Sequence, residues 1–304
     1  MRDQGSDATG PPARGRERSV SCGAVAVLLG VLVAVAFGSG DFVGGRASMS
    51  APTAAVLVVS QWCAVVGAVV VAVLVGARVS TADLLYGACA GGINVVGLGL
   101  LYRGLASSAM GVVAPVTAVI ASVLPVVWGL ARGERPSAIV LVGAALAIAA
   151  GGLIARESQP TGGRAIASGT ALAVAAGAAL GTSLVLYSET SAASGFWPVL
   201  TGRAAAALLA TAFVVALASR RELALPVGSA RRLAVAAGAL DVTATALLLA
   251  ALRHGLLVVV APVAALAPGF TVVLAWVLLR QHLERHQLVG LLVALTGLVL
   301  VALG

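Results

Sequence analysis

The chain has 304 residues, of which 60% are hydrophobic and 10% are charged, with a mean hydropathy of +1.08. A water-soluble domain carries about 25% charged residues, so this composition excludes a soluble globule and indicates a surface that faces lipid. The net charge is +8, and every basic residue is an arginine. The arginines are scattered between apolar runs without interleaved aromatic residues, which excludes nucleic acid as a partner.

Residues 1–21 are polar and rich in Gly, Pro and Arg, and we predict a disordered tail there. Ten apolar runs follow, each near the length of about 20 residues that a helix needs to cross a bilayer. They are predicted at 22–44, 52–76, 83–104, 108–130, 136–155, 165–187, 196–218, 231–252, 255–279 and 287–304. The first run could instead be a signal peptide cleaved near Ala36, but its length and the runs after it favour a membrane span.

An internal repeat relates the two halves of the chain at an offset of 147 residues. Val-Ala-Pro-Val occurs at 113–116 and again at 260–263, Gly91 corresponds to Gly238, and Asn94 corresponds to Asp241. An odd number of spans per half inserts the second half upside down. We therefore predict an all-α membrane protein with ten transmembrane helices in two inverted five-helix repeats. The repeats are predicted at 22–155 and 165–304, joined by a linker at 156–164.

Charge bias gives a prediction of orientation. The tail arginines together with Arg78, Arg132 and Arg135 favour a cytoplasmic N-terminus by the positive-inside rule. Ten spans then place the C-terminus in the cytoplasm too, in a multi-pass protein of the inner (cytoplasmic) membrane. The basic residues 220–221 and 231–232 disagree, because ten spans put them outside.

Several motifs in order resemble one known family. Gly-Ser-Gly-Asp-Phe-Val-Gly-Gly at 38–45 resembles the first helix of EamA-domain proteins of the drug/metabolite transporter superfamily. Residues 113–135, ending in Gly-Glu-Arg, resemble that domain's fourth helix and the loop after it, and residues 260–272 resemble the ninth helix. The resemblance implies a ten-helix exporter-type carrier with a central cavity. One departure is Gln281, which stands at the repeat position of Glu134.

Ionisable residues within the spans are the candidates for a transport site, because each costs about 2.5–3.5 kcal/mol in lipid and should face a partner or a wet cavity. Asp241 lies near the centre of the eighth span, and Thr245 lies one helical turn further on the same face. We predict that Asp241 and its repeat partner Asn94 form a polar site at the repeat interface, with Asp241 as acceptor of a proton or cation. The alternative is a structural hydrogen bond between helices.

Four further residues join this predicted site. Arg203 in the seventh span could pair with Asp241 or Asp41, bind a substrate carboxylate, or extend to the membrane surface. Gln61 and Trp62 lie at a comparable depth in the second span, although packing against lipid or the core suits Trp62 better. Asp41 ends the first span and belongs either to the site or to a charge pair at the membrane surface.

The repeat-related prolines Pro115 and Pro262 fall inside spans and are predicted hinges, with static kinks as the alternative. No metal site, cofactor or catalytic group is predicted. The function predicted is secondary active transport, as an exporter of a small metabolite, amino acid or drug-like solute by alternating access. Protons are the candidate coupling ion. The alternatives are a membrane-embedded enzyme and a membrane partner or sensor without flux.

Overall fold

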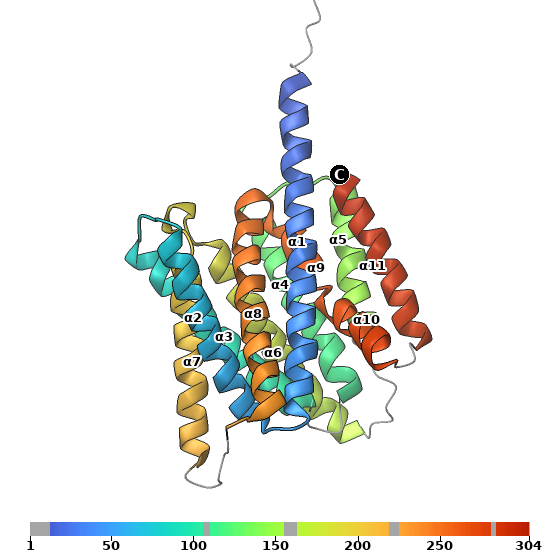
Figure 1. Cartoon of the computed structure of the whole chain (residues 1–304). Coiled ribbons are helices and arrows are strands. Elements are labelled where there is room, and N and C mark those ends of the chain that lie inside the picture. The colour runs from blue at the N-terminus through green and yellow to red at the C-terminus, as the bar shows by residue number, and fades with distance from the viewer. Residues whose placement is uncertain (1–12, 106–109, 155–162, 219–224, 281–283, 304) are drawn as a thin grey trace, which may run out of the picture.

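The structure is a computed structural model, and it describes residues 13–105, 110–154, 163–218, 225–280 and 284–303. These residues form α-helices and one short 3-10 helix, and no strand occurs among them (Figure 1). The elements are α1 Ala13–Ser48, α2 Thr53–Leu74, α3 Thr81–Leu105, α4 Met110–Ala131, α5 Ala138–Ile154, α6 Gly163–Ser188, η1 Ala192–Ser194, α7 Trp197–Ala218, α8 Gly228–His254, α9 Leu257–Ala264, α10 Ala267–Leu279 and α11 Arg285–Leu303. The predicted all-α class is confirmed.

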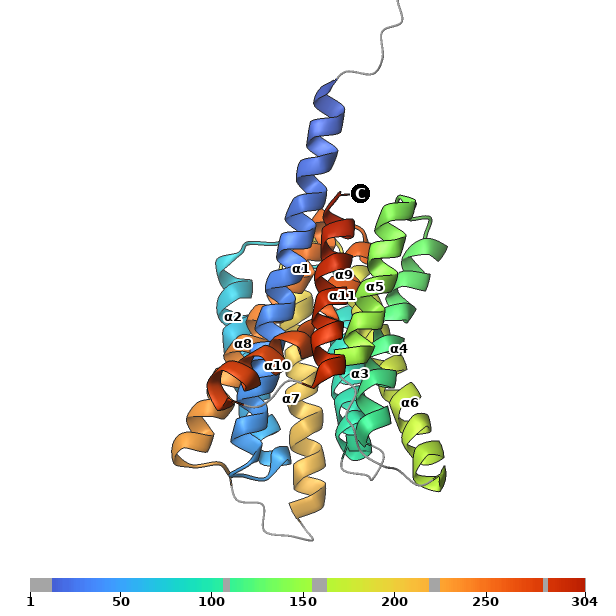
Figure 2. The same cartoon turned by 90° about the vertical axis from the view of Figure 1, so that its right-hand side faces the viewer.

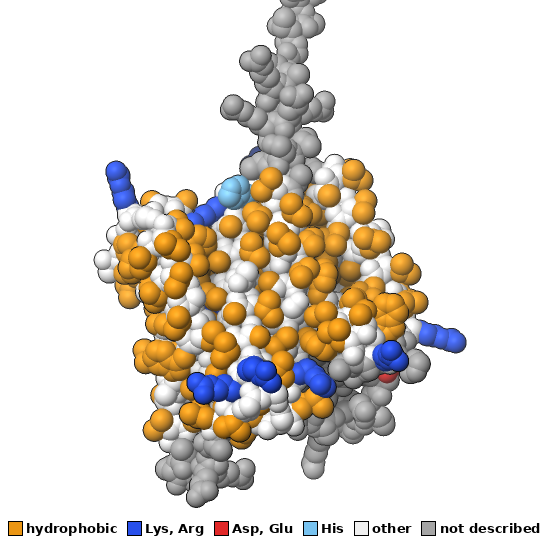
Figure 3. Space-filling view, in the orientation of Figure 1, with side chains coloured by type: hydrophobic (Ala, Val, Ile, Leu, Met, Phe, Trp, Pro, Cys, Tyr) orange, Lys and Arg blue, Asp and Glu red, His pale blue; other side chains and the backbone are white. Residues whose placement is uncertain are grey.

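The helices identify a multi-pass membrane protein. Eight stretches of the described residues are long and apolar enough to cross a bilayer, and α4 and α5 add two shorter apolar stretches, Val116–Ala131 and Ala138–Ile154. Figure 3 shows apolar side chains over the middle of one face, with basic side chains near its two ends. Such a surface suits a hydrocarbon layer bounded by water on both sides.

Two predicted spans coincide with candidate spans of the structure, Val25–Ser48 and Leu257–Leu278, but the helices that form them differ from the predicted bounds. The first helix begins at Ala13 rather than at residue 22, because the Ala, Arg and Glu residues before the apolar run favour a helix. The predicted span 255–279 is divided into α9 and α10. Pro268 has no N–H to donate, and its ring would clash with the carbonyl of Ala264, so the helix ends there. The tail residues 1–12 and the linker residues 156–162 lie outside the described residues.

The bundle is held by close contacts along whole helices. The largest contacts join α1 to α8, α4 to α6, α3 to both α6 and α7, and α5 to α11, which lie side by side in Figure 2. Helix α2 contacts both α7 and α8. Small residues permit the closest approaches: a Cβ atom on Gly91 would lie 1.9 Å from the Gly202 carbonyl oxygen. Lipid gives no hydrophobic drive for one helix to join another, so packing of small residues carries much of the association.

One end of the bundle contains the loop between α2 and α3 and the last residues of α11 (Figure 1). We refer to this end as the terminal face. Asp83 in the first turn of α3 is buried there and accepts from the Ser191 backbone N–H at 3.1 Å and from the Ser194 hydroxyl at 2.5 Å. The carboxylate thereby joins the start of α3 to η1, which precedes α7. This contact links the first half of the chain to the second half.

Glu134 makes a second contact between the halves at the terminal face. Its Oε1 and Oε2 atoms accept from the backbone N–H groups of Leu257 and Val258 at 2.8 and 2.9 Å. These donors begin α9, where the first N–H groups of a helix have no partner within the helix and favour negative charge. Glu134, in the loop after α4, therefore caps α9. Its repeat counterpart, Gln281, lies outside the described residues.

Candidate transport site

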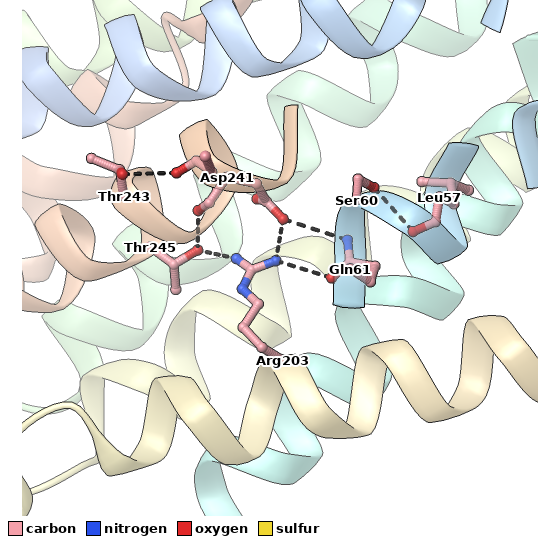
Figure 4. Close-up of polar contacts among 8 residues, drawn as sticks. Leu57, Ser60, Gln61, Arg203, Asp241, Thr243 and Thr245 are labelled. Atoms are coloured by element: carbon pink, nitrogen blue, oxygen red, sulfur yellow. Dashed lines mark hydrogen bonds and ion pairs between the residues drawn. The ribbon is translucent and has the colours of Figure 1, made fainter. Parts of the chain in front are cut away.

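A buried arginine lies at the centre of the candidate site. Arg203 is in the second turn of α7, and its side chain is 8% exposed. Nη1 of the guanidinium forms an ion pair with Oδ2 of Asp241, and Nη2 donates to the hydroxyl oxygen of Thr245 (Figure 4). The arginine thus points inward to α8 and does not extend to the membrane surface.

Gln61 on α2 connects to both members of the ion pair. Its Nε2 donates to Asp241 Oδ2, and its Oε1 accepts from Arg203 Nη1, each at 3.4 Å (Figure 4). An amide suits this place because it offers a donor and an acceptor on one side chain. The side chain is 3% exposed, so these contacts replace the water that it would otherwise bind.

The geometry on α8 follows from helical spacing. Asp241 and Thr245 are four residues apart and share one face, and the Thr245 hydroxyl donates to the Asp241 carbonyl at 3.0 Å. Thr243 lies between them in sequence but is exposed, and its hydroxyl donates to the Ala239 carbonyl at 2.7 Å. The α8 backbone therefore presents Asp241 and Thr245 together to Arg203.

The two charges of the site differ in exposure. The Asp241 side chain is 25% exposed, whereas that of Arg203 is 8% exposed. Removing two charges from water is costly, and their attraction offsets this cost only when further hydrogen bonds complete the pair. Gln61 and Thr245 supply those bonds. The carboxylate is thus the more exposed member of the pair.

Asp41 adds a second carboxylate beside the pair. Its helix, α1, packs against α8, where a Cβ atom on Gly40 would lie 3.9 Å from the Asp241 backbone nitrogen. Asp41 is exposed, and no hydrogen bond or ion pair among the described residues joins it to Arg203. Asp241 is the carboxylate paired with Arg203, and Asp41 lies on the neighbouring helix α1.

Two predicted residues lie outside the hydrogen-bonded cluster. Trp62 is 43% exposed, and its indole N–H donates to the Thr211 hydroxyl of α7 at 3.0 Å rather than to the cluster. Asn94 lies one turn beyond Gly91 on α3, and within the described chain no hydrogen bond joins it to the cluster. Packing at the outer surface is thus the better interpretation of Trp62.

The predicted hinges differ between the halves. Pro262 is buried inside α9, shortly before the helix is interrupted at Ala265. The α4 backbone is helical through Pro115, whose side chain lies outside the described set. Only the second of the two repeat-related prolines is therefore close to a break.

Tyr187 was not among the residues predicted for the site. This residue lies in the last turn of α6 and is 5% exposed. A Cβ atom on Gly202 would lie 2.1 Å from its hydroxyl oxygen. The sequence feature that could have indicated Tyr187 is its rarity, since only 4% of the residues are aromatic. Its position near the end of a span suits an anchor at the membrane surface equally well.

Comparison with known proteins gives a family match within the second half and a shared fold for most of the chain. The model of the EamA-like transporter family matches residues 167–303. A solved structure titled only "Crystal structure of protein" has a TM-score of 0.69 with 17% identity, and the alignment covers 91% of this chain and 97% of that one. At this identity the likeness shows a shared fold. No curated protein matches the chain.

Proposed function

We propose, from the premise that residues 167–303 belong to the EamA-like transporter family, that this chain is a secondary active transporter. It exports a small metabolite, amino acid or drug-like solute by alternating access. The observation that carries the proposal is the buried Arg203–Asp241 ion pair, held by α2, α7 and α8 among apolar helices. Ionisable groups at membrane depth are costly, and they mark the pathways of solutes and ions.

The proposed architecture keeps the two repeats, 22–155 and 165–304, and a recurring contact supports it. Gly91 of α3 packs on Gly202 of α7, and Gly238 of α8 packs on Ser60 of α2, where a Cβ would lie 2.2 Å from the Ser60 carbonyl oxygen. Gly238 lies 147 residues after Gly91, and Gly202 lies 142 residues after Ser60. At the same offset of 142 residues, Arg203 is the counterpart of Gln61.

The packing of α5 against α11 supports inversion of the repeats. Gly143 of α5 packs on Val301 of α11, and Gly290, the counterpart of Gly143, packs on Ile154, the counterpart of Val301. The start of each helix thus lies against the end of the other. Counterpart helices that pack antiparallel are related by an axis perpendicular to them, which lies in the membrane plane for inverted repeats.

The proposed mechanism uses the difference between the counterpart positions. The second half supplies Arg203 and Asp241, whereas the first half has Gln61 and Asn94. Protonation of Asp241, or the approach of a cationic group to it, weakens the ion pair and leaves the Thr245 hydroxyl as the remaining partner of Arg203 on α8. Contacts between α7 and α8 then differ between the loaded and unloaded states, which is what a ligand needs in order to shift a conformational equilibrium.

The interruption between α9 and α10 is the proposed hinge of the second half. Pro262 and Pro268 flank it, and α10 packs against α1, the helix that carries Asp41. A bend there moves α1 and α10 relative to α9, whose start is capped by Glu134. Pro115 is proposed as the corresponding hinge in α4.

We further propose that both termini lie in the cytoplasm and that the protein spans the inner membrane. The arginines at residues 2, 14, 16 and 18 precede the first span and support this orientation. The terminal face is then the cytoplasmic face. In this orientation the contacts of Asp83 and Glu134 close the cytoplasmic end of the bundle.

Solute flux through the purified protein in proteoliposomes tests the function. Wild-type protein should exchange a solute identified by a thermal-shift screen of metabolites, and Asp241→Asn should reduce this exchange at least about tenfold while the protein still folds. Thr243→Ala is the matched control, because Thr243 lies on the same helix but outside the cluster. Unchanged flux in Asp241→Asn would exclude the proposed role of Asp241. Absence of flux for every solute bound would favour an enzyme or a partner without transport.

A further inference from the structure

Exposed arginines gather at the end of the bundle opposite the terminal face. Figure 3 shows basic side chains in a row across the lower part of the face that Figure 1 presents, below its apolar middle. The helix ends on this side are the end of α1, the start of α8, the end of α10 and the start of α11. We call the exposed arginines at these helix ends the arginine row; they are Arg46, Arg231, Arg232, Arg280 and Arg285.

The packing of α1 against α8 brings three members of the row to one seam. Ala47 of α1 and Ala234 of α8 are both 0% exposed and belong to the same buried cluster. Arg46 directly precedes Ala47, while Arg231 and Arg232 precede Ala234 by a few residues. The end of α1 therefore lies against the start of α8, and Arg46 is within about one helical turn of the two α8 arginines along the seam.

The guanidinium groups of the row have no protein partner among the described residues. None of them forms an ion pair or a hydrogen bond with the part of the chain that the structure describes. The acidic residues described near these helix ends are Asp41 and Glu284, and Glu284 already contacts His286 at 3.3 Å. Five cations near two carboxylates leave this surface positively charged, and it can attract an anion.

Neither helix stability nor membrane topology accounts for the row. Arg231 and Arg232 lie within the first five residues of α8, where the helix dipole disfavours positive charge. In the proposed orientation the row faces away from the cytoplasm, so the positive-inside rule does not explain it either. A partner of opposite charge would explain why these cations gather at this end.

We propose that the arginine row, centred on Arg46, Arg231 and Arg232, binds the phosphate groups of anionic phospholipids. The row borders the apolar surface that faces hydrocarbon, which is the depth of the lipid headgroups. Guanidinium groups bind phosphate oxygens through charge-assisted hydrogen bonds, which are the strong ones. A lipid phosphate at the seam joins α1 to α8, the helices that carry Asp41 and Asp241, and stabilises their packing. This lipid site does not depend on the proposed transport function.

A triple variant tests the inference, because it removes the charges at the seam and keeps polar side chains: Arg46→Gln with Arg231→Gln and Arg232→Gln. The matched control removes the same charge from exposed arginines of the terminal face: Arg78→Gln with Arg132→Gln and Arg135→Gln. Each purified protein in neutral detergent is titrated with phosphatidylglycerol, with phosphatidylethanolamine or with inorganic phosphate. The rise in melting temperature above the protein's own additive-free value gives an apparent Kd.

Phosphatidylglycerol should stabilise wild type and the control variant to the same extent. Each basic residue near an anionic lipid surface contributes about fivefold in affinity, so the seam variant should bind about a hundredfold more weakly. Phosphatidylethanolamine and inorganic phosphate should have little effect on any of the proteins. The additive-free melting temperature of the seam variant should stay close to that of wild type, because its three changes are exposed.

Four results would overturn the inference. The seam variant could bind phosphatidylglycerol as wild type does, or the control variant could lose as much affinity as the seam variant. Phosphatidylethanolamine could stabilise wild type as well as phosphatidylglycerol does, or inorganic phosphate could do so, which would indicate a site for a free anion. The titration contains no solute, so a failure of the transport function would leave its outcome unchanged.

Discussion

The ion pair at the centre of the bundle allows a quantitative prediction from a double-mutant cycle. Arg203→Gln removes the partner of Asp241 together with the bonds to Gln61 and Thr245. Removing one member of a buried pair costs about 3–5 kcal/mol. The Asp241 side chain is 25% exposed and can regain part of its hydration, so we expect the lower end, about 3 kcal/mol of unfolding free energy.

Asp241→Asn leaves the arginine buried but keeps one side-chain oxygen as an acceptor, so we expect a loss of about 2–3 kcal/mol. The double variant carries two amides that can bond to each other and no longer buries a charge. Its loss should be about 3 kcal/mol, well below the sum of the single losses, because residues in contact couple by up to about 3 kcal/mol.

The assay is reversible unfolding of the purified protein in mixed micelles, followed for wild type, the two single variants and the double variant. Arg232→Gln serves as the control, since Arg232 is exposed at the start of α8 and outside the cluster. We expect that change to alter stability by less than about 0.5 kcal/mol. Additivity of Arg203→Gln and Asp241→Asn within about 0.5 kcal/mol would refute the buried pair as described.

Two further predictions concern the terminal face. Glu134→Gln should destabilise the protein by about 1–2 kcal/mol, because one of the two carboxylate oxygens that accept from α9 is replaced by an NH₂ group, which faces a backbone N–H donor. Unfolding in mixed micelles measures this loss. A variant as stable as wild type would argue against the cap. The second prediction uses a variant in which Cys22, Cys63 and Cys89 are replaced by serine and one cysteine is introduced in the α2–α3 loop, at the terminal face. A membrane-impermeant thiol reagent applied to intact spheroplasts should not label this cysteine. Labelling at that position would reverse the proposed orientation.

Much of the architecture follows from patterns in the sequence. Long apolar runs interrupted by Arg, Pro and Gly predict helices that cross a membrane, and the structure has helices at these places. The cost of an ionisable group in lipid singled out Asp241 and Arg203, and the structure pairs them. The division between α9 and α10 was missed, because prolines are also tolerated in continuous membrane helices.

What the sequence by itself determined is which few residues must avoid lipid, because that depends on their chemistry alone. The tertiary structure decided which partners they meet. Helices that are apolar on every side carry no pattern that shows which face turns inward, so the sequence did not show that Gln61 contacts both Arg203 and Asp241 or that Trp62 donates to Thr211. Tyr187 reaches the site only because small residues on neighbouring helices leave room for its ring, and that space exists only after the helices pack.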